Sequence, residues 1–292
     1  MVLAAKPRIR EISDADLAAV GDLLTRGFGY RPREYWMRGL QRQASRPVPA
    51  DAPRYGYLLE NEGVSVGCLL LIYSSRILAG ETVIRCNVSS WYVDPAFRNY
   101  AALFASMAQK RKDVTYLNVT PATHTWPILE AQGYQAYCRG RLFSVPVLSG
   151  GGRGMRVEAV GADTKAVEGL PDADLELLRR HAEYGCLSLV CHTREGALPF
   201  IFFPLRKRRG IIPVPAMLLG YCNSIADYVR CAGALGRYLL RHGAPVVIVD
   251  ANGPVAGLTG VYREPQGRKY FKGPHPAALG DLADTELAIY GM

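Results

Sequence analysis

The sequence predicts an α/β protein with mixed sheets, built as two similar halves. Three observations carry this prediction. A strand, a helix and a strand follow one another over residues 82–119, the layout of a right-handed crossover between parallel strands. The same layout returns over residues 211–250, and the stretch SGGGRGMR at 149–156 separates the two. A chain of 292 residues fits two domains of about 140 residues each.

Hydrophobic periodicity and capping residues give the elements of the first half. They are strand Arg8–Ile12, helices 14–26 and Arg33–Gln43, strands Tyr55–Glu60, Val64–Tyr73 and Thr82–Val93, helix Asn99–Lys110, strand Val114–Val119, helix Thr123–Ala131 and strand Leu142–Val147. Asn61, Glu62 and Gly63 have the chemistry of a hairpin turn. The first half therefore alternates strands and helices around one mixed sheet.

The second half follows a similar order with weaker motifs. Its predicted elements are strand Arg156–Val160, helix Asp172–Tyr184, strands Leu187–His192, Leu198–Pro204 and Ile211–Asn223, helix Ile225–His242, and strands Pro245–Asp250 and Glu286–Tyr290. We interpret this half as a degenerate repeat of the first. The basic run LRKRRG at 205–210 falls between two apolar strands, and a hairpin turn is favoured there over an anion site.

The glycine-rich stretch sets the expected domain boundaries. We expect a first domain over 1–148, a linker over 149–155 and a second domain over 156–292. A phosphate-binding loop is the alternative for GGGRG, but no helix with a lysine and a serine or threonine follows it.

Composition narrows the class of protein. Hydrophobic residues make up 49% and charged residues 21%, which is typical of a globular chain. No apolar run reaches the roughly 18 residues of a membrane span, and the N-terminus lacks a secretory signal, so we expect a cytoplasmic protein with no membrane partner. The net charge of +9 is spread along the chain without a nucleic-acid signature, so a nucleic-acid partner is not expected.

The cysteines predict buried thiols rather than a disulfide framework or a metal site. There are seven of them, mostly within apolar runs and without a CxxC pair.

Two stretches of the first half carry a resemblance to a known family. YVDPAFR at 92–98 is similar to the V-x-P-x-x-R that ends the fourth strand of the GCN5-related N-acetyltransferases (GNATs), and ILEAQGY at 128–134 is similar to their L-Y-E-K-x-G-F. The match spans about residues 8–148. The resemblance implies two GNAT-like domains in tandem, and acetyl-CoA or another acyl-CoA as co-substrate.

In that family the pyrophosphate rests on backbone N–H groups of a glycine-rich turn at the start of the third helix. The resemblance places the cofactor contacts of this chain at Tyr92, Val93, Arg98, Asn99, Tyr100, Ala101, Ala102 and Leu103. Arg98 is retained, whereas Ala101 and Leu103 replace both glycines. We expect the Leu103 side chain to turn into the core with Phe104, because it would otherwise crowd the phosphates. The alternative is an ordinary strand-to-helix turn with Arg98 as a surface charge.

The usual proton carriers of the family are missing. Leu129 occupies the position of the tyrosine acid, and the strand 82–93 has no carboxylate. His124 is the best candidate acid or base because the ordinary pKa of histidine lies near neutrality, and Tyr134, Tyr137 and Tyr92 are further candidates. The alternative for His124 is a histidine that only bonds its neighbours. Asn252, Tyr262 and His275 are candidates for an acceptor-site wall.

Together these features predict an acyl-CoA-dependent N-acyltransferase whose acceptor is a small-molecule or peptide amine. The alternative is a non-catalytic ligand-binding or assembly module that keeps the fold. A transferase that uses aminoacyl-tRNA would fit the basic charge, but no motif supports it. The oligomeric state and the acyl chain length are left open.

Overall fold

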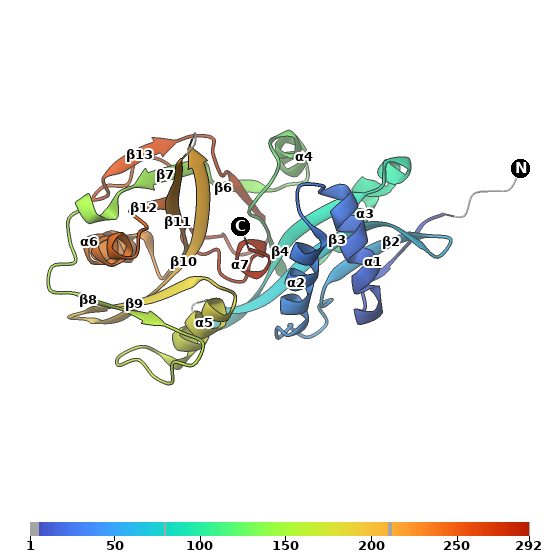
Figure 1. Cartoon of the computed structure of the whole chain (residues 1–292). Helices are drawn as coiled ribbons and strands as arrows, with labels where there is room; N and C mark the ends of the chain where they lie inside the picture. The colour runs from blue at the N-terminus through green and yellow to red at the C-terminus, as the bar shows by residue number, and fades with distance from the viewer. Residues whose placement is uncertain (1–5, 79, 210–211, 292) are drawn as a thin grey trace, which may run out of the picture. The chain divides into compact units, whose positions relative to one another are not determined.

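The structure is a computed structural model, and it describes residues 6–78, 80–209 and 212–291. The chain forms two compact units (Figure 1). The first unit consists of residues Met1–Gln135, Phe271–Pro276 and Asp284–Tyr290, and the second consists of Ala136–Tyr270, Ala277–Ala283 and Gly291–Met292. The C-terminal segment therefore contributes to both units.

The first unit holds the elements predicted for residues 8–131. Its strands are β1 (Arg8–Glu11), β2 (Gly56–Asn61), β3 (Val64–Leu78), β4 (Glu81–Val93) and β5 (Val114–Asn118). Its helices are α1 (Leu17–Gly27), α2 (Arg33–Ala44), α3 (Ala101–Ala108), α4 (Trp126–Ala131) and α7 (Glu286–Ile289). β6 (Gln135–Cys138) and β14 (Lys269–Lys272) lie where the chain passes from one unit to the other.

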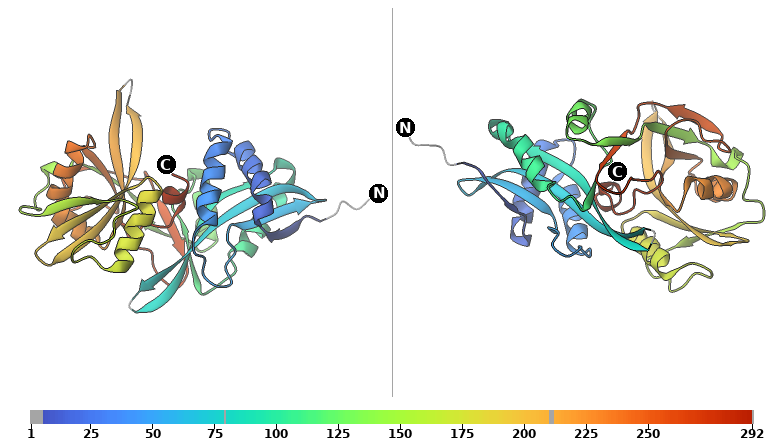
Figure 2. Two further views of the ribbon diagram at one scale, coloured as in Figure 1. Left: turned by 60° about the horizontal axis from the view of Figure 1, so that its bottom comes forward. Right: turned by 180° about the vertical axis from the view of Figure 1, so that it is seen from behind.

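The hairpin and the helices of this unit follow from the sequence pattern. Glu62 and Gly63 both have positive φ, 51° and 79°, as the tight turn between β2 and β3 requires. Val20 and Leu24 are buried on one face of α1, which packs with α2 against β3 and β4 (Figures 1 and 2).

The second unit is built around another sheet. Its strands are β7 (Gly140–Ser144), β8 (Arg156–Val160), β9 (Leu187–Thr193), β10 (Gly196–Arg209), β11 (Ile212–Cys222), β12 (Val246–Ala251) and β13 (Gly260–Arg263), and its helices are α5 (Asp172–Glu183) and α6 (Ile225–Arg241). β10 and β11 pair antiparallel as the predicted hairpin requires, but the basic run does not form its turn, because residues 205–209 continue β10 and pair with β11 as far as Arg209 with Ile212. Gly210 and Ile211 lie outside the described residues.

The two helices of the second unit cover opposite faces of its sheet. Leu189 of β9 and Phe200 of β10 belong to the apolar core beneath α6 (Figure 1). Ser188 points the other way, and its Oγ donates a 2.7 Å hydrogen bond to the carbonyl oxygen of Leu178 on α5. Alternation along a strand accounts for this division, because neighbouring side chains leave opposite faces of a sheet.

Both sheets have seven strands and the same plan, which confirms the predicted α/β class with mixed sheets. Their orders are β1-β2-β3-β4-β5-β14-β6 and β13-β7-β12-β11-β10-β9-β8. In each, three antiparallel pairs lead to one parallel pair, β4 with β5 or β11 with β12. The crossovers over 82–119 and 211–250 therefore occupy equivalent positions.

Two predicted strands are corrected. The strand expected at Leu142–Val147 to close the first sheet is β7, and it pairs with β12 and β13 in the second sheet. β14, from the C-terminal part of the chain, takes the corresponding place beside β5. The strand expected at Glu286–Tyr290 is the short helix α7.

The glycine-rich segment expected as a linker lies within the second unit and packs on α6. A Cβ at Gly152 would come within 2.4 Å of the Ala234 nitrogen, and one at Gly233 within 2.4 Å of the Gly151 carbonyl oxygen. Arg237 donates a 2.7 Å hydrogen bond to the carbonyl oxygen of Gly152. The glycines therefore allow the backbone to lie directly against the helix.

The burial of the cysteines and the character of the helices agree with what the composition predicts. Six of the seven cysteines are buried and Cys186 is partly exposed, as predicted for core thiols. Across residues 6–78, 80–209 and 212–291, the structure has no helix whose length and apolar character would suit a membrane span.

Candidate active site

The candidate site of the first unit begins where β4 and β5 separate. These strands pair in parallel from Ile84 with Val114 to Asn87 with Leu117, and β4 then continues to Val93 without β5 beside it, still paired with β3. The side chain of Asn87 bridges the last pair, because its Nδ2 donates a 3.2 Å hydrogen bond to the carbonyl oxygen of Leu117. The two strands are thus joined up to this point and open beyond it.

A β-bulge lies directly after the point of separation. Leu69 of β3 pairs with Trp91 and Leu71 pairs with Val88, so two residues of β4, Ser89 and Ser90, oppose a single residue of β3. A bulge changes the direction of the side chains that follow it, and bulges are common beside active sites.

A pocket of about 440 Å³ lies at the end of β4. It is lined by Gly27, Phe28, Trp91, Tyr92, Val93, Arg98, Ala101 and His124. Five of these residues were singled out in the sequence, namely Tyr92, Val93, Arg98, Ala101 and His124. Asn99, Tyr100, Ala102 and Leu103 do not line the pocket. The pocket has the size of a small-ligand site, which ranges from roughly 300 to 1,000 Å³.

Arg98 and His124 bring unpaired polar groups to the pocket. Both side chains are exposed. Neither takes part in a hydrogen bond or an ion pair with the described residues, apart from what its backbone does. By contrast, Asp94 beside Arg98 is paired with Arg26 at 2.9 Å. Arg98 and His124 are therefore available to an outside ligand, the former as a cation and the latter as a proton donor or acceptor.

The corner before α3 differs from the expected turn. Residues Pro95–Tyr100 form a 3-10 helix that runs directly into α3, and the N–H of Ala101 donates to the carbonyl oxygen of Arg98. That donor is consequently satisfied within the protein. Leu103 is 57% exposed, so the expectation that it turns into the core is wrong. Phe104, Ala105 and Ala108 form the buried face instead.

Gly27 shapes the wall of the pocket. A Cβ at this position would lie 2.4 Å from Cδ2 of Tyr92, so only glycine lets the Tyr92 ring pack against the end of α1. Burial and a hydrogen bond with Asp94 raise the pKa of the Tyr92 hydroxyl, which therefore stays protonated at neutral pH.

Tyr134 lies away from the lining of this pocket. Its side chain is buried, and its hydroxyl donates to Oε1 of Gln109. Burial raises the pKa of Tyr134 far above its usual range. Leu129, at the position of the family's tyrosine, is buried as well. Among the residues named from the sequence as proton carriers, His124 and Tyr92 line the pocket.

A carboxylate that sequence reasoning missed lies beside the bulge. Ser89 donates a 2.5 Å hydrogen bond to Oε2 of Glu286, and Thr120, two residues beyond β5, donates to Oε1. The N–H of Glu286 donates to Oδ1 of Asn87 at 2.7 Å. Burial raises the pKa of Glu286 above its ordinary value, while the two hydroxyl donors oppose that shift. Glu286 is 197 residues from Ser89 in sequence, so no local pattern connects them.

The corresponding corner of the second unit has a paired arginine. A pocket of about 300 Å³ near the start of α6 is lined in part by Asn223, Glu195 and Arg230. Arg230 pairs with Asp227 at 2.8 Å and also with Glu195. Its charge is therefore neutralised within the protein, in contrast to that of Arg98.

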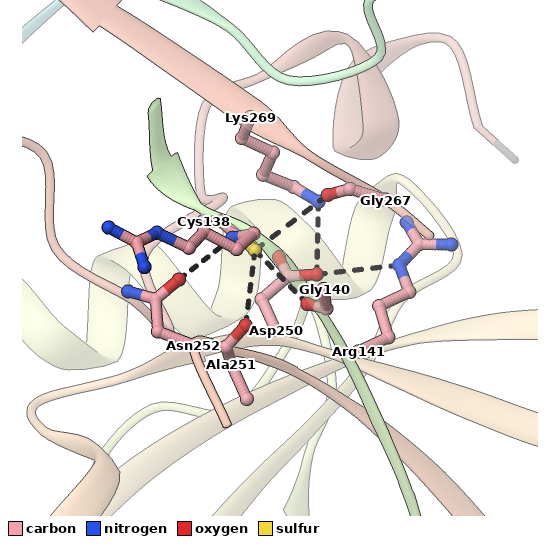
Figure 3. A network of polar contacts seen from close by, with 9 residues as sticks. Cys138, Gly140, Arg141, Asp250, Ala251, Asn252, Gly267 and Lys269 are labelled. Carbon is pink, nitrogen blue, oxygen red and sulfur yellow. Dashed lines mark hydrogen bonds and ion pairs between the residues drawn. The ribbon is translucent and has the colours of Figure 1, made fainter. Parts of the chain in front are cut away.

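The second unit also contains a buried ionic network (Figure 3). Nζ of Lys269, which is fully buried, lies 3.0 Å from Oδ1 of Asp250 at the end of β12 and donates to the carbonyl oxygen of Gly267. Nε of Arg141 lies 3.4 Å from the same carboxylate oxygen. Every group in the network has a partner, which is what buried charges require.

The three residues expected in an acceptor-site wall have structural contacts. Asn252, labelled in Figure 3, accepts a 2.7 Å hydrogen bond from the N–H of Arg139. Its Nδ2 donates to the carbonyl oxygen of Tyr137. Tyr262 packs on Gly140 in the second unit. His275 exchanges backbone hydrogen bonds with the Thr115 hydroxyl in the first unit. Their role at an acceptor site stays a prediction.

The comparisons with known proteins concern the fold. A GCN5-related N-acetyltransferase from Anabaena variabilis has a TM-score of 0.58 and 12% identity, over 91% of this chain and 72% of that one. One from Kribbella flavida has a TM-score of 0.55 and 17% identity, over 91% and 70%. A conserved protein from Enterococcus faecalis has a TM-score of 0.55 and 10% identity, over 96% and 74%.

No protein-family model and no curated protein matches this sequence. The structural likeness nevertheless extends over about nine tenths of the chain. The chain has the fold of the GCN5-related N-acetyltransferases.

Proposed function

We propose that the protein is an acyl-CoA-dependent N-acyltransferase whose acceptor is an amine on a small molecule or a peptide. One observation carries the proposal. Two unpaired groups, Arg98 and His124, line one pocket at the point where β4 has separated from β5. A cation suits a phosphate of coenzyme A, and an imidazole suits proton transfer to or from the reacting groups.

The residues fit an acyl-CoA co-substrate in part. β4 lacks β5 as a partner beyond Asn87, so an extended amide chain could pair with its backbone there. Arg98 would hold a phosphate near the start of α3. The bound thioester would supply the acyl group and the thiol leaving group. The chain itself would orient the amine, exclude water with Trp91 and Phe28, and return a proton to the leaving sulfur from His124.

A second candidate function is a non-catalytic binding module. The Ala101 N–H is already bonded to Arg98, and Leu129 stands where the family has its acid. Both features remove groups that a transferase of this fold commonly uses. This candidate predicts that coenzyme A binds but that no acyl group is transferred.

A thiol-release assay separates the two candidates. The full chain would be incubated with acetyl-CoA and a panel of amines comprising lysine, spermidine, glucosamine and a peptide with a free N-terminus. Acetylated product would be confirmed by mass spectrometry. Release with at least one amine supports the transferase. Coenzyme A binding without release from any amine supports the binding module.

His124→Ala tests the assigned residue. We expect a rate lower by about 10²-fold or more, the usual contribution of a general acid or base. His242→Ala is the matched control, because His242 is an exposed histidine of the second unit. Equal rates for the parent and the His124 variant would remove His124 from the mechanism.

A further inference from the structure

Acyl transfer to an amine involves two proton transfers, and the residues that line the pocket do not supply a separate group for each of them. An attacking amine must lose a proton, and the departing thiolate must gain one. His124 can serve one of these needs at a time. In the second half of β4 the sequence offers Cys86, Asn87, Ser89 and Ser90, none of which is a carboxylate.

Glu286 brings a carboxylate to this place from the C-terminal segment. Its two oxygens accept hydrogen bonds from Ser89 and Thr120, one on each side of the gap between β4 and β5. Ser89 is two residues from Trp91, which lines the pocket, and this corresponds to about 7 Å along a strand. Glu286 is partly exposed as a residue, and Thr120, which donates to its Oε1, is exposed.

Aromatic side chains of α2 pack between the pocket wall and the segment that carries Glu286. The ring of Phe28, in the pocket wall, lies 5.4 Å from that of Trp36, and Trp36 lies 4.9 Å from Tyr35. Burial raises the pKa of Tyr35, and the negative charge of Glu286 adds to this shift. The ring of Trp36 also lies 6.0 Å from that of Tyr290, so the aromatic cluster extends from the pocket wall to the segment that carries Glu286.

Contacts on both sides fix α7, which carries Glu286. The buried side chain of Asp284 lies 2.9 Å from that of Arg46. The hydroxyl of Tyr290 donates a 2.9 Å hydrogen bond to Oε1 of Gln43. The carboxylate is thus held on the first unit at a defined place, as a catalytic group requires.

The charged and titratable groups around Glu286 leave its carboxylate without a counter-ion. Tyr35 of α2 and Tyr290, which directly follows α7, interact with it electrostatically, and Ser89 and Thr120 donate to it. Within the described part of the chain no lysine, arginine or histidine pairs with Glu286. A carboxylate in such surroundings is a better base than an exposed one.

We propose that Glu286 is the general base of the proposed acyl transfer, accepting the amine proton directly or through one water. The inference rests on the proposed function. In the step, the amine nitrogen forms a bond to the thioester carbonyl carbon, and the carbon–sulfur bond breaks. The amine proton passes to Glu286, and the departing thiolate takes a proton from His124. Glu286 later releases its proton to solvent, and His124 takes up a proton from solvent.

Ser89 is a positioning residue in this scheme. Its hydroxyl bond favours the charged form of Glu286, so its loss raises the pKa of the carboxylate. The rate depends on the ionised base, so kcat/KM falls as pH drops through that pKa. Ser89→Ala should therefore move this acidic limb to higher pH. A purely structural serine would lower the rate without moving the limb.

The test measures kcat/KM for thiol release between pH 5 and 9 with the full chain, the parent and three variants. Glu286→Gln keeps the shape of the side chain, and we expect a loss of about 10²- to 10⁴-fold. Glu81→Gln removes an exposed carboxylate from the same strand β4 and should change nothing. Calorimetry with coenzyme A should give all four proteins similar affinity, which shows that the fold is intact.

The outcomes are distinguishable. An active parent with an equally active Glu286→Gln variant overturns the role of Glu286 and leaves the transferase standing. An inactive parent that binds coenzyme A overturns the proposed transferase and the role of Glu286 with it. A large loss in Glu286→Gln, together with a shifted limb in Ser89→Ala, supports the inference.

Discussion

Oδ1 of Asn87 accepts a 2.7 Å hydrogen bond from the N–H of Glu286, while Nδ2 of the same amide donates to the carbonyl oxygen of Leu117. Asn87 is 2% exposed. One buried amide thus joins the last paired residues of β4 and β5 to the helix that carries the carboxylate. The place where the strands separate and the place of the C-terminal segment are set by the same side chain.

Asn87→Ala should lower the free energy of unfolding of the first unit by about 2–3 kcal/mol, because it leaves the Glu286 N–H and the Leu117 carbonyl without this partner. Urea unfolding followed by tryptophan fluorescence is a suitable measurement, since all three tryptophans belong to the first unit. Asn99→Ala, at an exposed position, is the control and should change stability by less than about 0.5 kcal/mol. Equal midpoints for both variants would refute the bridging role.

Gly27→Ala should displace the ring of Tyr92 and distort the pocket, since the added Cβ would lie 2.4 Å from that ring. We expect about 1–3 kcal/mol of destabilisation, the usual cost of overpacking, and weaker binding of coenzyme A. Gly29→Ala is the matched control, because a Cβ there has no neighbour within 4 Å. Thermal melting and calorimetry would measure both effects. Unchanged affinity in the Gly27 variant would show that the position of the Tyr92 ring does not affect the binding of coenzyme A.

Asp250→Asn should destabilise the second unit strongly, because it leaves the fully buried Lys269 without its counter-ion. Removing one partner of a buried pair costs about 3–5 kcal/mol. Replacing both, as in Asp250→Leu with Lys269→Met, should recover part of that loss, since no buried charge is then left alone. Circular dichroism during heating would compare the variants. A double variant less stable than the single one would contradict this account.

The stability of the first unit should carry a pH signature of Glu286. Burial raises the pKa of this carboxyl above its ordinary value of 4.5, so the folded state holds the proton more tightly than the unfolded state. The contribution to stability is therefore largest below pH 4.5 and declines as pH rises through the folded pKa. The advantage of Glu286→Gln over the parent should accordingly grow with pH. A difference that is constant from pH 4 to 8, as expected for Glu81→Gln, would contradict the shift.

Much of the fold could be predicted because its elements are local. Local sequence patterns predict each of these elements: the apolar runs of β4 and β5, the turn at Glu62 and Gly63, and the apolar stripe on α6. The exchange of the closing strands could not be predicted. β7 and β14 are both short strands that mix apolar and polar residues, and only long-range packing decides which sheet each one joins.

The site was predictable where it lies within one motif. Tyr92, Arg98 and His124 come from stretches that the family resemblance covers, and the structure gathers them at one pocket. The direction of Leu103 was mispredicted because α3 has apolar residues on two faces, and helical spacing alone could not choose between Leu103 and Phe104. Glu286 was missed because its partners are far away in sequence.

Isothermal titration of the full chain with acetyl-CoA tests the central claim, that the opening between β4 and β5 is an acyl-CoA site. We expect the parent to bind and Arg98→Ala to bind more weakly by about 1–3 kcal/mol, the value of a charge-assisted contact. Arg8→Ala, which removes an exposed arginine of β1, should bind like the parent. No binding by the parent at millimolar acetyl-CoA, or equal affinity in the Arg98 and Arg8 variants, would contradict the account.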